Sequence, residues 1–380
     1  MPKSHVEKLS YAICSARSGI ALTLLLLSAV IPPPLLNAQN LPSPITVKRC
    51  WGYAVSTLTD QRISSDGSRV FLPEDAARVE AISITDGTRI WYSDLGGEIV
   101  SNIVENNASV FVTTAAKDQA GNITGTSLRS LSKETGITNW VAELPAAQTV
   151  YLGASSSVVV AISDKGKIAT FDGSSGARRW NAQLAGAVSA APYFAKERFI
   201  VPTDAPDVTI LSTADGAVIQ KRPSAFRLTA VFLLDANQGA SGDERGNLTL
   251  FNVGEPGTIW KLKHGAGVSD IGLVDETLLV TSNDNFVYAV AISNGNVRWK
   301  KRQQDRVFTP GVLAGDVIVV SSRTGGISTM LEGSHGKVLD QIQLQNDSAV
   351  IHPPLAVGNS ILIPATNEIA AYSLNGCSAK

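Results

Sequence analysis

The chain has few charged residues and is almost neutral. Asp, Glu, Lys and Arg make up 17% of its 380 residues, and the formal net charge at pH 7 is −1. Such a balance offers no electrostatic basis for binding DNA, RNA or an anionic membrane surface, and we predict no nucleic-acid partner. With 32 glycines and 44% hydrophobic residues, the composition favours a well-packed chain with many tight turns over a disordered one.

The sequence also lacks the patterns that mark common active sites. It contains no Ser-His-Asp, zinc-ligand or phosphate-loop signature. His264, His335 and His352 lack metal-ligand spacing, which indicates surface or turn histidines. Asp204 and Asp207, in "PTDAPD", could together bind a cation, but an acidic pair in a turn more often serves the turn itself. We therefore predict no catalytic, cofactor-binding or metal-binding residue, and a chain that is not an enzyme.

Cysteine is scarce, and the first of the three cysteines falls in a predicted export signal. Three basic residues precede the apolar run of residues 19–31, and residues 36–38 form a tolerable small-residue cleavage site. We predict that residues 1–38 are a secretion signal. An uncleaved anchor is the alternative, disfavoured because three prolines interrupt an apolar run already short of the ~20 residues of a spanning helix. We expect a periplasmic or secreted protein with no membrane span after signal removal.

A short pattern returns along the rest of the chain: an apolar strand, a turn with Gly, and Trp four residues after that Gly. "TDGTRIW", "ETGITNW", "SSGARRW" and "SNGNVRW" show it most clearly, and two further copies end in Gln and Asp in place of Trp. The ordered positions are separated by 40, 49, 40, 40, 40, 39 and 41 residues. A repeat of this length must be recognised before any fold is assigned. The eight positions are Trp51, Trp91, Trp140, Trp180, Gln220, Trp260, Trp299 and Asp340.

The one long interval contains a polar, Gly-rich tract, "AAKDQAGNITGTS", from Ala115 to Ser127. We interpret it as a turn enlarged by about nine residues, which leaves the repeat intact. Rigid repeat proteins place recognition on variable turns. Lys117, Asp118 and Asn122 are therefore candidate partner-binding residues, although an ordinary flexible loop is the simpler interpretation.

Each repeat predicts four short strands. Two apolar strands joined by a tight turn follow each Trp strand, then comes a second turn and a third strand such as "IATFD" or "VYAVA". Short strands, Gly, Asp and Asn turns and a period near 40 describe a β-propeller blade. The last repeat lacks its own Trp strand, which the segment around Trp51 would supply. We predict an all-β fold: one eight-bladed propeller of four-stranded antiparallel blades over residues 39–380, its last blade closed by the N-terminal strand.

The two remaining cysteines test this closure. When the last blade is superposed on the repeat, Cys377 falls at or just after the turn Gly, while Cys50 lies one residue before Trp51. Those positions are close neighbours in an unbroken blade, so a disulfide is plausible in an exported chain. The alternative is two unrelated thiols.

The repeat resembles the tryptophan-docking repeat of the PQQ-like (quinoprotein-like) β-propellers, with "ATFDGSSGARRW" and "VYAVAISNGNVRW" the most similar stretches. Within that superfamily the length, the export signal and the absence of added domains are most similar to the BamB family of the outer-membrane barrel-assembly machinery. Two features differ. No lipobox Cys follows the apolar run, and residues 185–188 are small and apolar where that family has an Arg.

The recurring Trp could stack a flat cofactor, as in quinoprotein enzymes, but one position repeated in every blade indicates packing between neighbouring blades. At Gln220 and Asp340, which stand in place of Trp, we then predict weaker contacts between the neighbouring blades. The basic stretch with Lys300, Lys301 and Arg302 is expected on an outermost strand, where charges protect a sheet edge, with partner binding as the alternative.

The resemblance implies a non-catalytic, exported scaffold, monomeric on its own, that binds protein partners in a bacterial envelope and serves outer-membrane protein assembly. One alternative is a small PQQ-dependent oxidoreductase or PQQ-binding protein, with Ca²⁺ as the associated ion. A second alternative is a glycan-binding propeller.

Overall fold

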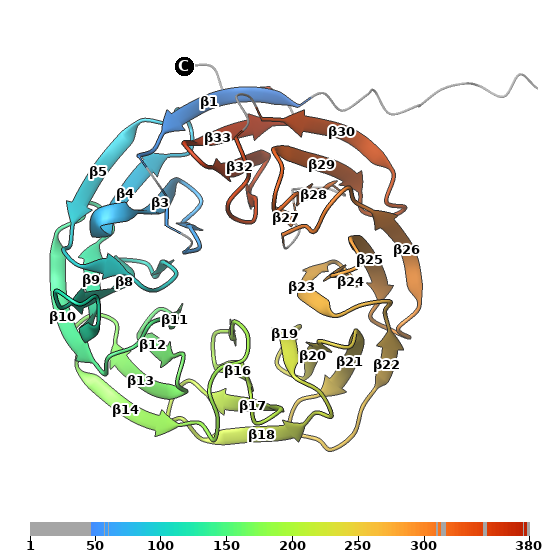
Figure 1. The fold of residues 1–380 in the computed structure, drawn as a ribbon, viewed down its shortest axis with the longest axis horizontal. Coiled ribbons are helices and arrows are strands. Elements are labelled where there is room, and N and C mark those ends of the chain that lie inside the picture. The colour runs from blue at the N-terminus through green and yellow to red at the C-terminus, as the bar shows by residue number, and fades with distance from the viewer. Residues whose placement is uncertain are drawn as a thin grey trace, which may run out of the picture. The chain divides into compact units, whose positions relative to one another are not determined.

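A ring of eight antiparallel sheets makes up the described part of the chain (Figure 1). The computed structural model describes residues 47–377 except 57, 60, 309–310, 313–316, 345–347 and 375. The predicted export signal, residues 1–38, lies outside the described residues. Within them, no helix has the length and apolarity needed to cross a membrane.

The blades are numbered from the first complete one, and their strands are as follows. Blade 1 has β2 (Ser64–Ser65), β3 (Arg69–Glu74), β4 (Arg78–Ser83) and β5 (Arg89–Asp94), with a 3₁₀ turn, η1 (Asp75–Ala77). Blade 2 has β6 (Glu98–Ile99), β7 (Val104–Glu105), β8 (Ser109–Lys117), β9 (Ile123–Ser132) and β10 (Thr138–Leu144). Blade 3 has β11 (Val150–Ala154), β12 (Val158–Ser163), β13 (Lys167–Asp172) and β14 (Arg178–Gln183). Blade 4 has β15 (Tyr193–Phe194), β16 (Arg198–Thr203), β17 (Asp207–Ser212) and β18 (Val218–Pro223).

The second half continues in the same way. Blade 5 has β19 (Leu228–Leu233), β20 (Gln238–Asp243), β21 (Asn247–Asn252) and β22 (Trp260–Lys263). Blade 6 has β23 (Val268–Val274), β24 (Thr277–Ser282), β25 (Phe286–Ala291) and β26 (Val297–Arg302). Blade 7 has β27 (Gly311–Val312), β28 (Val317–Ser321), β29 (Ile327–Glu332) and β30 (Val338–Gln343). Blade 8 has β31 (Leu355–Val357), β32 (Ser360–Ala365), β33 (Glu368–Ser373) and the N-terminal β1 (Lys48–Ala54).

The predicted ring closure is confirmed. The sheet of blade 8 has the order β1-β33-β32-β31, so the first strand of the fold is the outermost strand of the last blade. Trp51 pairs with Ala371 and Tyr53 with Ile369 in antiparallel register. Blade 2 departs from the simple four-strand pattern, because β6 and β7 both pair with β8 and together form its inner strand.

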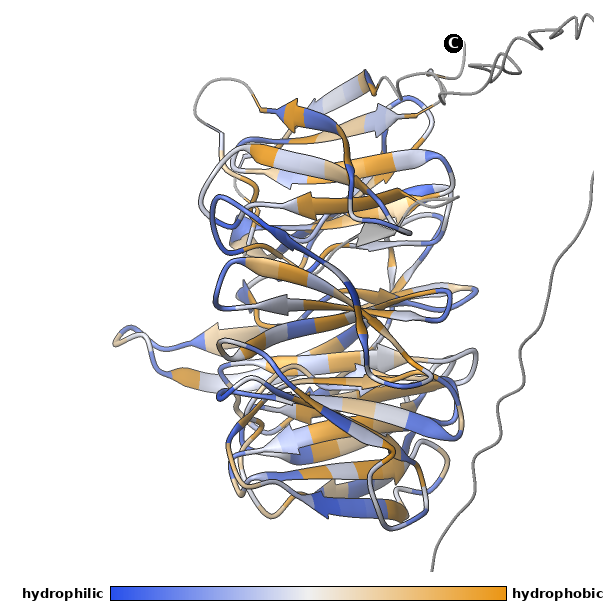
Figure 2. Cartoon of the chain, turned by 90° about the vertical axis from the view of Figure 1, so that its right-hand side faces the viewer, coloured by the Kyte–Doolittle hydropathy of each residue, from blue (hydrophilic) through white to orange (hydrophobic). Residues whose placement is uncertain are grey.

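The hydrophobic core lies mainly between neighbouring blades. In the side view, hydrophobic and hydrophilic residues occur within the same strands (Figure 2). The middle strands are almost entirely buried: every residue of β12 and of β24 is buried. One core cluster joins Phe111 and Leu128 of blade 2 with Leu152 and Phe171 of blade 3. The outermost strands instead alternate exposed and half-buried residues, which is the pattern of a sheet covered on one side only.

Candidate protein-interaction surface

The recurring Trp residues connect each blade to the next one. The indole Nε1 of Trp91, on β5, donates a hydrogen bond to the carbonyl of Lys133 in blade 2 at 2.8 Å. Its ring covers Gly136, whose φ is +71°, and a Cβ there would lie 2.5 Å from Trp91 Cε3. This position therefore requires Gly for two reasons, the backbone conformation and the aromatic contact. The corresponding acceptors for Trp51, Trp140, Trp180, Trp260 and Trp299 are the carbonyls of Ile84, Gly173, Thr213, Ile292 and Gly333.

The two polar replacements form the same kind of connection. Gln220 donates from Nε2 to the carbonyl of Glu255 at 2.6 Å and accepts from the Gly254 amide at 3.3 Å. Asp340 accepts a hydrogen bond from the amide of Val47 at 3.2 Å, which links blade 7 to the N-terminal strand. These two interfaces lack an indole but keep hydrogen bonds between the blades.

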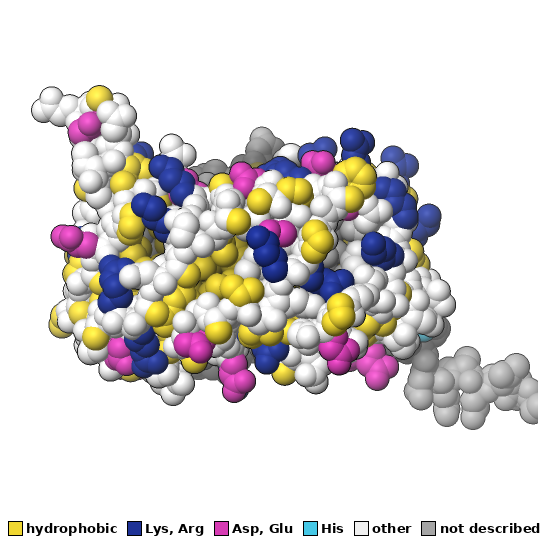
Figure 3. All heavy atoms as spheres, turned by 90° about the horizontal axis from the view of Figure 1, so that it is seen from below, with side chains coloured by type: hydrophobic (Ala, Val, Ile, Leu, Met, Phe, Trp, Pro, Cys, Tyr) yellow, Lys and Arg dark blue, Asp and Glu magenta, His cyan; other side chains and the backbone are white. Residues whose placement is uncertain are grey.

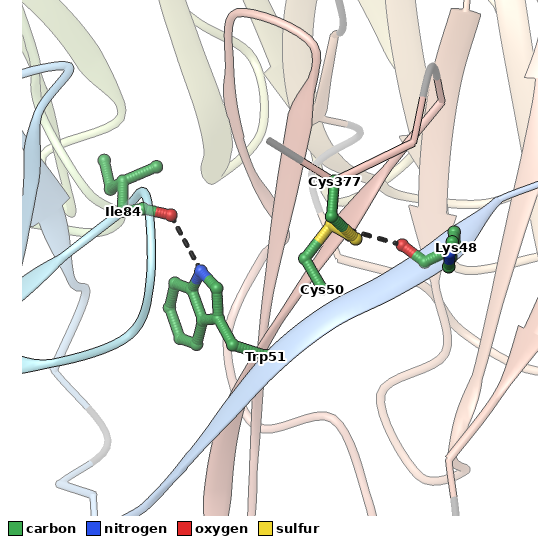
Figure 4. The surroundings of a disulfide bond; sticks show 5 residues. All are labelled: Lys48, Cys50, Trp51, Ile84 and Cys377. Carbon is green, nitrogen blue, oxygen red and sulfur yellow. Dashed lines mark hydrogen bonds between the residues drawn. A yellow bond between two sulfur atoms is a disulfide. The ribbon is translucent and has the colours of Figure 1, made fainter. Parts of the chain in front are cut away.

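A disulfide fastens the closing strand. Cys50, on β1, is bonded to Cys377, 327 residues later, with a Cα–Cα distance of 5.2 Å (Figure 4). Figure 4 also shows Trp51, the next residue on β1, whose Nε1 donates to the Ile84 carbonyl at 2.7 Å. Disulfides persist in oxidising compartments, so the bond indicates such a compartment for this chain.

The three histidines lie apart and outside the strands. His335 is exposed, whereas His264 and His352 are buried, so of the predicted surface or turn histidines only His335 lies on the surface. His352 contacts the Thr59 carbonyl at 2.7 Å. The imidazole of His264 packs on the ring of Tyr288 at 4.4 Å between centroids, and burial lowers its pKa to about 4.

The acidic pair serves the local structure. Asp207 is buried, accepts a hydrogen bond from Thr203 Oγ1 at 2.8 Å and forms an ion pair with Lys221 at 2.8 Å. Across the described part of the chain, no three His, Cys, Asp or Glu side chains are placed to hold a metal ion.

One hollow opens toward the centre of the ring. It has a volume of about 520 Å³ and is lined by inner strands of blades 1 to 4. Its carboxylate, Glu105, accepts a hydrogen bond from Ser64, and burial raises its pKa. Its guanidinium, Arg62, is paired with Asp270 at 3.4 Å. Ca²⁺ needs six to eight oxygen ligands, several of them carboxylates, so these donors do not fit a quinone bound with calcium.

The long interval of the repeat forms a β-hairpin, not the enlarged turn expected from the sequence. Strands β8 and β9 are nine and ten residues long, whereas the middle strands of most other blades have six. Pairing continues to Lys117↔Ile123, and the turn between them is short. Figures 2 and 3 show a hairpin projecting beyond one face of the ring, and in Figure 3 it stands on the left, where Figure 1 places β8 and β9.

The predicted partner-binding residues of the hairpin lie at its tip. Lys117, Asp118 and Asn122 are all exposed. Asp118 accepts hydrogen bonds from the Asn122 backbone at 2.8 Å and side chain at 3.1 Å, which orders the turn. Lys117 forms an ion pair with Glu98 at the base of the hairpin. A hollow of about 450 Å³ lies beside this pair and reaches Lys165 of blade 3.

The basic stretch lies far from the hairpin. Lys300, Lys301 and Arg302 are on β26, the outermost strand of blade 6, on the side of the ring across from β8 and β9 in Figure 1. Lys300 lies over the ring of Phe286 at 5.5 Å, and Lys301 lines a hollow between blades 6 and 7. The two groups of candidate residues are therefore not brought together in one site.

A feature that the sequence did not reveal is an apolar slot in the side wall between blades 2 and 3. It has a volume of about 380 Å³ and opens beside the outermost strand β14. Leu144 and Pro145, at the end of the outermost strand of blade 2, line one side, and Val150, Ala161 and Ala169 of the blade 3 sheet line the other. Figure 3 shows hydrophobic atoms gathered in a hollow of this side wall, with Lys and Arg around it.

The slot follows from two small residues at equivalent repeat positions. Ala142 stands two residues after Trp140, and Ala169 is the third residue of β13. At the same two positions of every other interface at least one side chain is larger, as with Tyr53 and Glu80 or Leu262 and Tyr288. Only the interface of blades 2 and 3 has Ala on both sides, so the space between the sheets stays open. Comparing these positions across the repeats would have revealed the slot.

Comparison with known families covers most of the repeat. A family model described as outer membrane protein assembly factor BamB matches residues 46–188, 127–219 and 244–375. The chain belongs to this BamB family. A search of curated proteins gave no match.

Solved structures show the same fold at low sequence identity. BamB from Moraxella catarrhalis has a TM-score of 0.69 and 15% identity, covering 88% of this chain and 100% of that one. The computationally designed Ika8 protein has a TM-score of 0.70 and 15% identity, with coverages of 84% and 97%. The C-terminal WD40 domain of Sif2 has a TM-score of 0.71 and 12% identity, with coverages of 87% and 99%. A designed protein and a WD40 domain share the ring, so the fold alone carries no function.

Proposed function

We propose that this BamB-family chain is an exported, non-catalytic scaffold that binds protein partners in the bacterial envelope and serves the assembly of outer-membrane β-barrel proteins. The observation that carries the proposal is the family match, which spans residues 46–219 and 244–375. The predicted signal in residues 1–38 and the disulfide between Cys50 and Cys377 support export to an oxidising compartment.

The architecture suits docking. Each indole or its polar replacement connects one blade to the next, and the disulfide closes the ring, so the exposed turns stand on a rigid frame. Binding surfaces that are already ordered lose little conformational entropy when a partner docks. The hairpin of blade 2 is the longest excursion from this frame among the described strands.

Site-specific photocrosslinking in the native host tests the proposal. A photoreactive amino acid at Asp118, on the hairpin tip, is expected to give an adduct with a component of the β-barrel assembly machinery. The matched control is the same amino acid at Asp215, in an exposed turn next to Gly216 that joins the two outer strands of blade 4. Depletion of the chain is expected to lower outer-membrane β-barrel proteins. Absence of any adduct, together with normal outer-membrane composition after depletion, would refute the proposal.

Two further measurements test the competing functions, PQQ-dependent oxidation and glycan binding. Purified mature chain is incubated with PQQ and Ca²⁺, and quinone absorbance and dye-linked alcohol or sugar oxidation are followed. If the chain retains quinone stoichiometrically and turns over substrate, its function is that of an oxidoreductase and the scaffold proposal is wrong. Selective binding on a glycan array would replace it by a glycan-binding propeller.

A further inference from the structure

We propose that the slot between blades 2 and 3 receives an apolar side chain from an extended, acidic segment of a partner protein. The inference rests on the proposed scaffold function, because it names the chemistry of the partner and the place where it docks. It follows from three features of the slot: its apolar walls, its uncompensated positive charge and a free strand edge beside it.

The walls of the slot are suited to an apolar group. Leu144 of blade 2 faces Val150, Ala161 and Ala169 of the blade 3 sheet, and all four are buried or half-buried. The volume of about 380 Å³ lies in the range of ~300–1,000 Å³ found for binding pockets. A side chain anchored in a small desolvated pocket is the usual centre of a protein–protein contact.

The charge around the slot selects the partner. Lys167 and Arg178 line the slot, and Lys165 lies two residues before Lys167 in the chain. All three side chains are exposed. Neither lysine has an ion-pair partner in the described part of the chain. Arg178 donates to the Asn181 side chain at 2.8 Å and to the Glu143 carbonyl at 2.9 Å, so no carboxylate neutralises it.

Few carboxylates oppose these cations. Glu143 is exposed nearby on β10. Asp164, in the same turn as Lys165, is half-buried. Three cations against one exposed carboxylate favour a segment that carries Asp or Glu beside its apolar anchor, since complementary charges accelerate association and exclude basic competitors.

The neighbouring strand favours an extended segment. β14 is the last strand of its sheet, and Asn181–Gln183 of this strand line the slot. Its outer backbone edge is therefore open to pairing. An extended peptide that pairs with such an edge gains main-chain hydrogen bonds, while pockets for alternate side chains give specificity.

Fluorescence polarisation with three labelled peptides tests which kind of segment binds in the slot. The first alternates Glu with Phe and Leu, the second alternates Lys with the same apolar residues, and the third alternates Glu with Ser. The first is expected to bind, more weakly at high salt, and the other two at least tenfold more weakly. Equal binding of all three, or no binding of the first peptide, would overturn the inference.

Two pairs of variants test whether the peptide binds at the slot. Ala169→Leu adds bulk to a wall of the slot, and Ala142→Leu adds bulk beside it, next to the core cluster that contains Ala169. Each variant is expected to weaken binding of the first peptide at least tenfold. Ala142 is half-buried whereas Ala169 is buried, so this variant remains informative if Ala169→Leu misfolds. Lys167→Glu is expected to weaken binding of the first peptide and to make that binding less dependent on salt concentration. Its matched control is Lys261→Glu on exposed β22, which should bind as the wild type does. Unchanged binding in both slot variants would locate the contact elsewhere.

The outcomes separate this inference from the scaffold function. If Ala142→Leu loses the peptide but still gives the Asp118 crosslink in cells, the slot binds such segments and the hairpin carries the physiological contact. If the variant keeps both, the slot inference fails and the scaffold stands. Absence of the crosslink in the wild type, with peptide binding intact, refutes the scaffold function alone.

Discussion

The hydroxyl of Tyr53 donates a hydrogen bond to Oε2 of Glu80 at 2.7 Å, and this contact joins the last blade to the first. Tyr53 lies on β1 and Glu80 on β4. Glu80 is only 2% exposed and also accepts from Arg89 at 3.2 Å. Burial, together with the bond to Glu80, raises the pKa of Tyr53 to about 12. The closing strand is therefore held by a polar contact as well as by Trp51.

Removing this hydroxyl should weaken the closure. In Tyr53→Phe, buried Glu80 keeps only Arg89, and loss of one hydrogen bond to a buried carboxylate costs about 1–3 kcal/mol. The pH dependence should change too. A tyrosine that ionises near pH 10 when unfolded but near 12 when folded loses stability as pH rises through this interval. Urea unfolding at pH 8, 10 and 11 should show a smaller alkaline loss in the variant. Tyr92→Phe, on exposed β5, is the control, and equal alkaline slopes for the wild type and Tyr53→Phe would contradict the assignment.

Reduction of the disulfide should open the same closure. A bond between Cys50 and Cys377 constrains nearly the whole unfolded ring, which in the chain-entropy model is worth about 6 kcal/mol. The urea midpoint of the wild type is expected to fall on addition of dithiothreitol. The double variant Cys50→Ser, Cys377→Ser should start at the lower midpoint and show no response to reductant. A response of the double variant would assign the effect to something other than this bond.

An indole between blades should contribute more than an exposed aromatic residue on the same strand. Trp91 is 7% exposed and hydrogen-bonded to Lys133, whereas its neighbour Tyr92 is 50% exposed. Trp91→Ala should cost about 3–5 kcal/mol, because it removes both buried area and the contact with Gly136. Tyr92→Ala should cost below about 1 kcal/mol. Denaturant titrations of the two variants provide the comparison, and similar losses would mean that the indole does not fasten the blades.

The ring could be predicted because its determinants recur. Six Trp and two substitutes share one register, so the place of Trp51 in the last blade follows from the period alone. Cys50 and Cys377 then fall close together without any three-dimensional information. A feature repeated eight times is visible in one sequence, since each copy supports the others.

Features that occur once were harder to predict. The glycines of the tract 115–127 favour a turn, whereas Ile123, Thr124 and Thr126 are β-branched and favour the strand that is found. The slot depends on two alanines that look ordinary in sequence and become significant only when blades face each other. Burial of His264 depends likewise on Tyr288 of the next blade, whose approach no local pattern encodes.

His264 should make the fold sensitive to acid. Burial lowers its pKa from 6.5 to about 4, and its Nε2 has no hydrogen-bond partner among the described residues. An unfolded histidine binds a proton near pH 6.5, so stability is complete above that pH and declines toward pH 4, by about 3 kcal/mol at most. His264→Phe keeps the aromatic contact with Tyr288 and cannot titrate. Its unfolding free energy should change less between pH 7 and pH 4.5 than that of the wild type. His335→Phe, at an exposed position, should leave the pH profile unchanged, and a matching change there would remove His264 from this role.

The hairpin should be dispensable for folding and required for docking. Ala115 and Thr126 are paired across β8 and β9, so residues 116–125 can be replaced by Asn-Gly, the preferred two-residue connection of paired strands. The removed residues are mostly exposed, and the lost ion pair of Lys117 with Glu98 lies at the surface, where such pairs contribute below about 1 kcal/mol. The urea midpoint should therefore stay close to that of the wild type. Co-purification of envelope partners should fall sharply, while the acidic peptide should still bind at the slot. Full recovery of the partners by the shortened chain would show that docking uses another part of the ring.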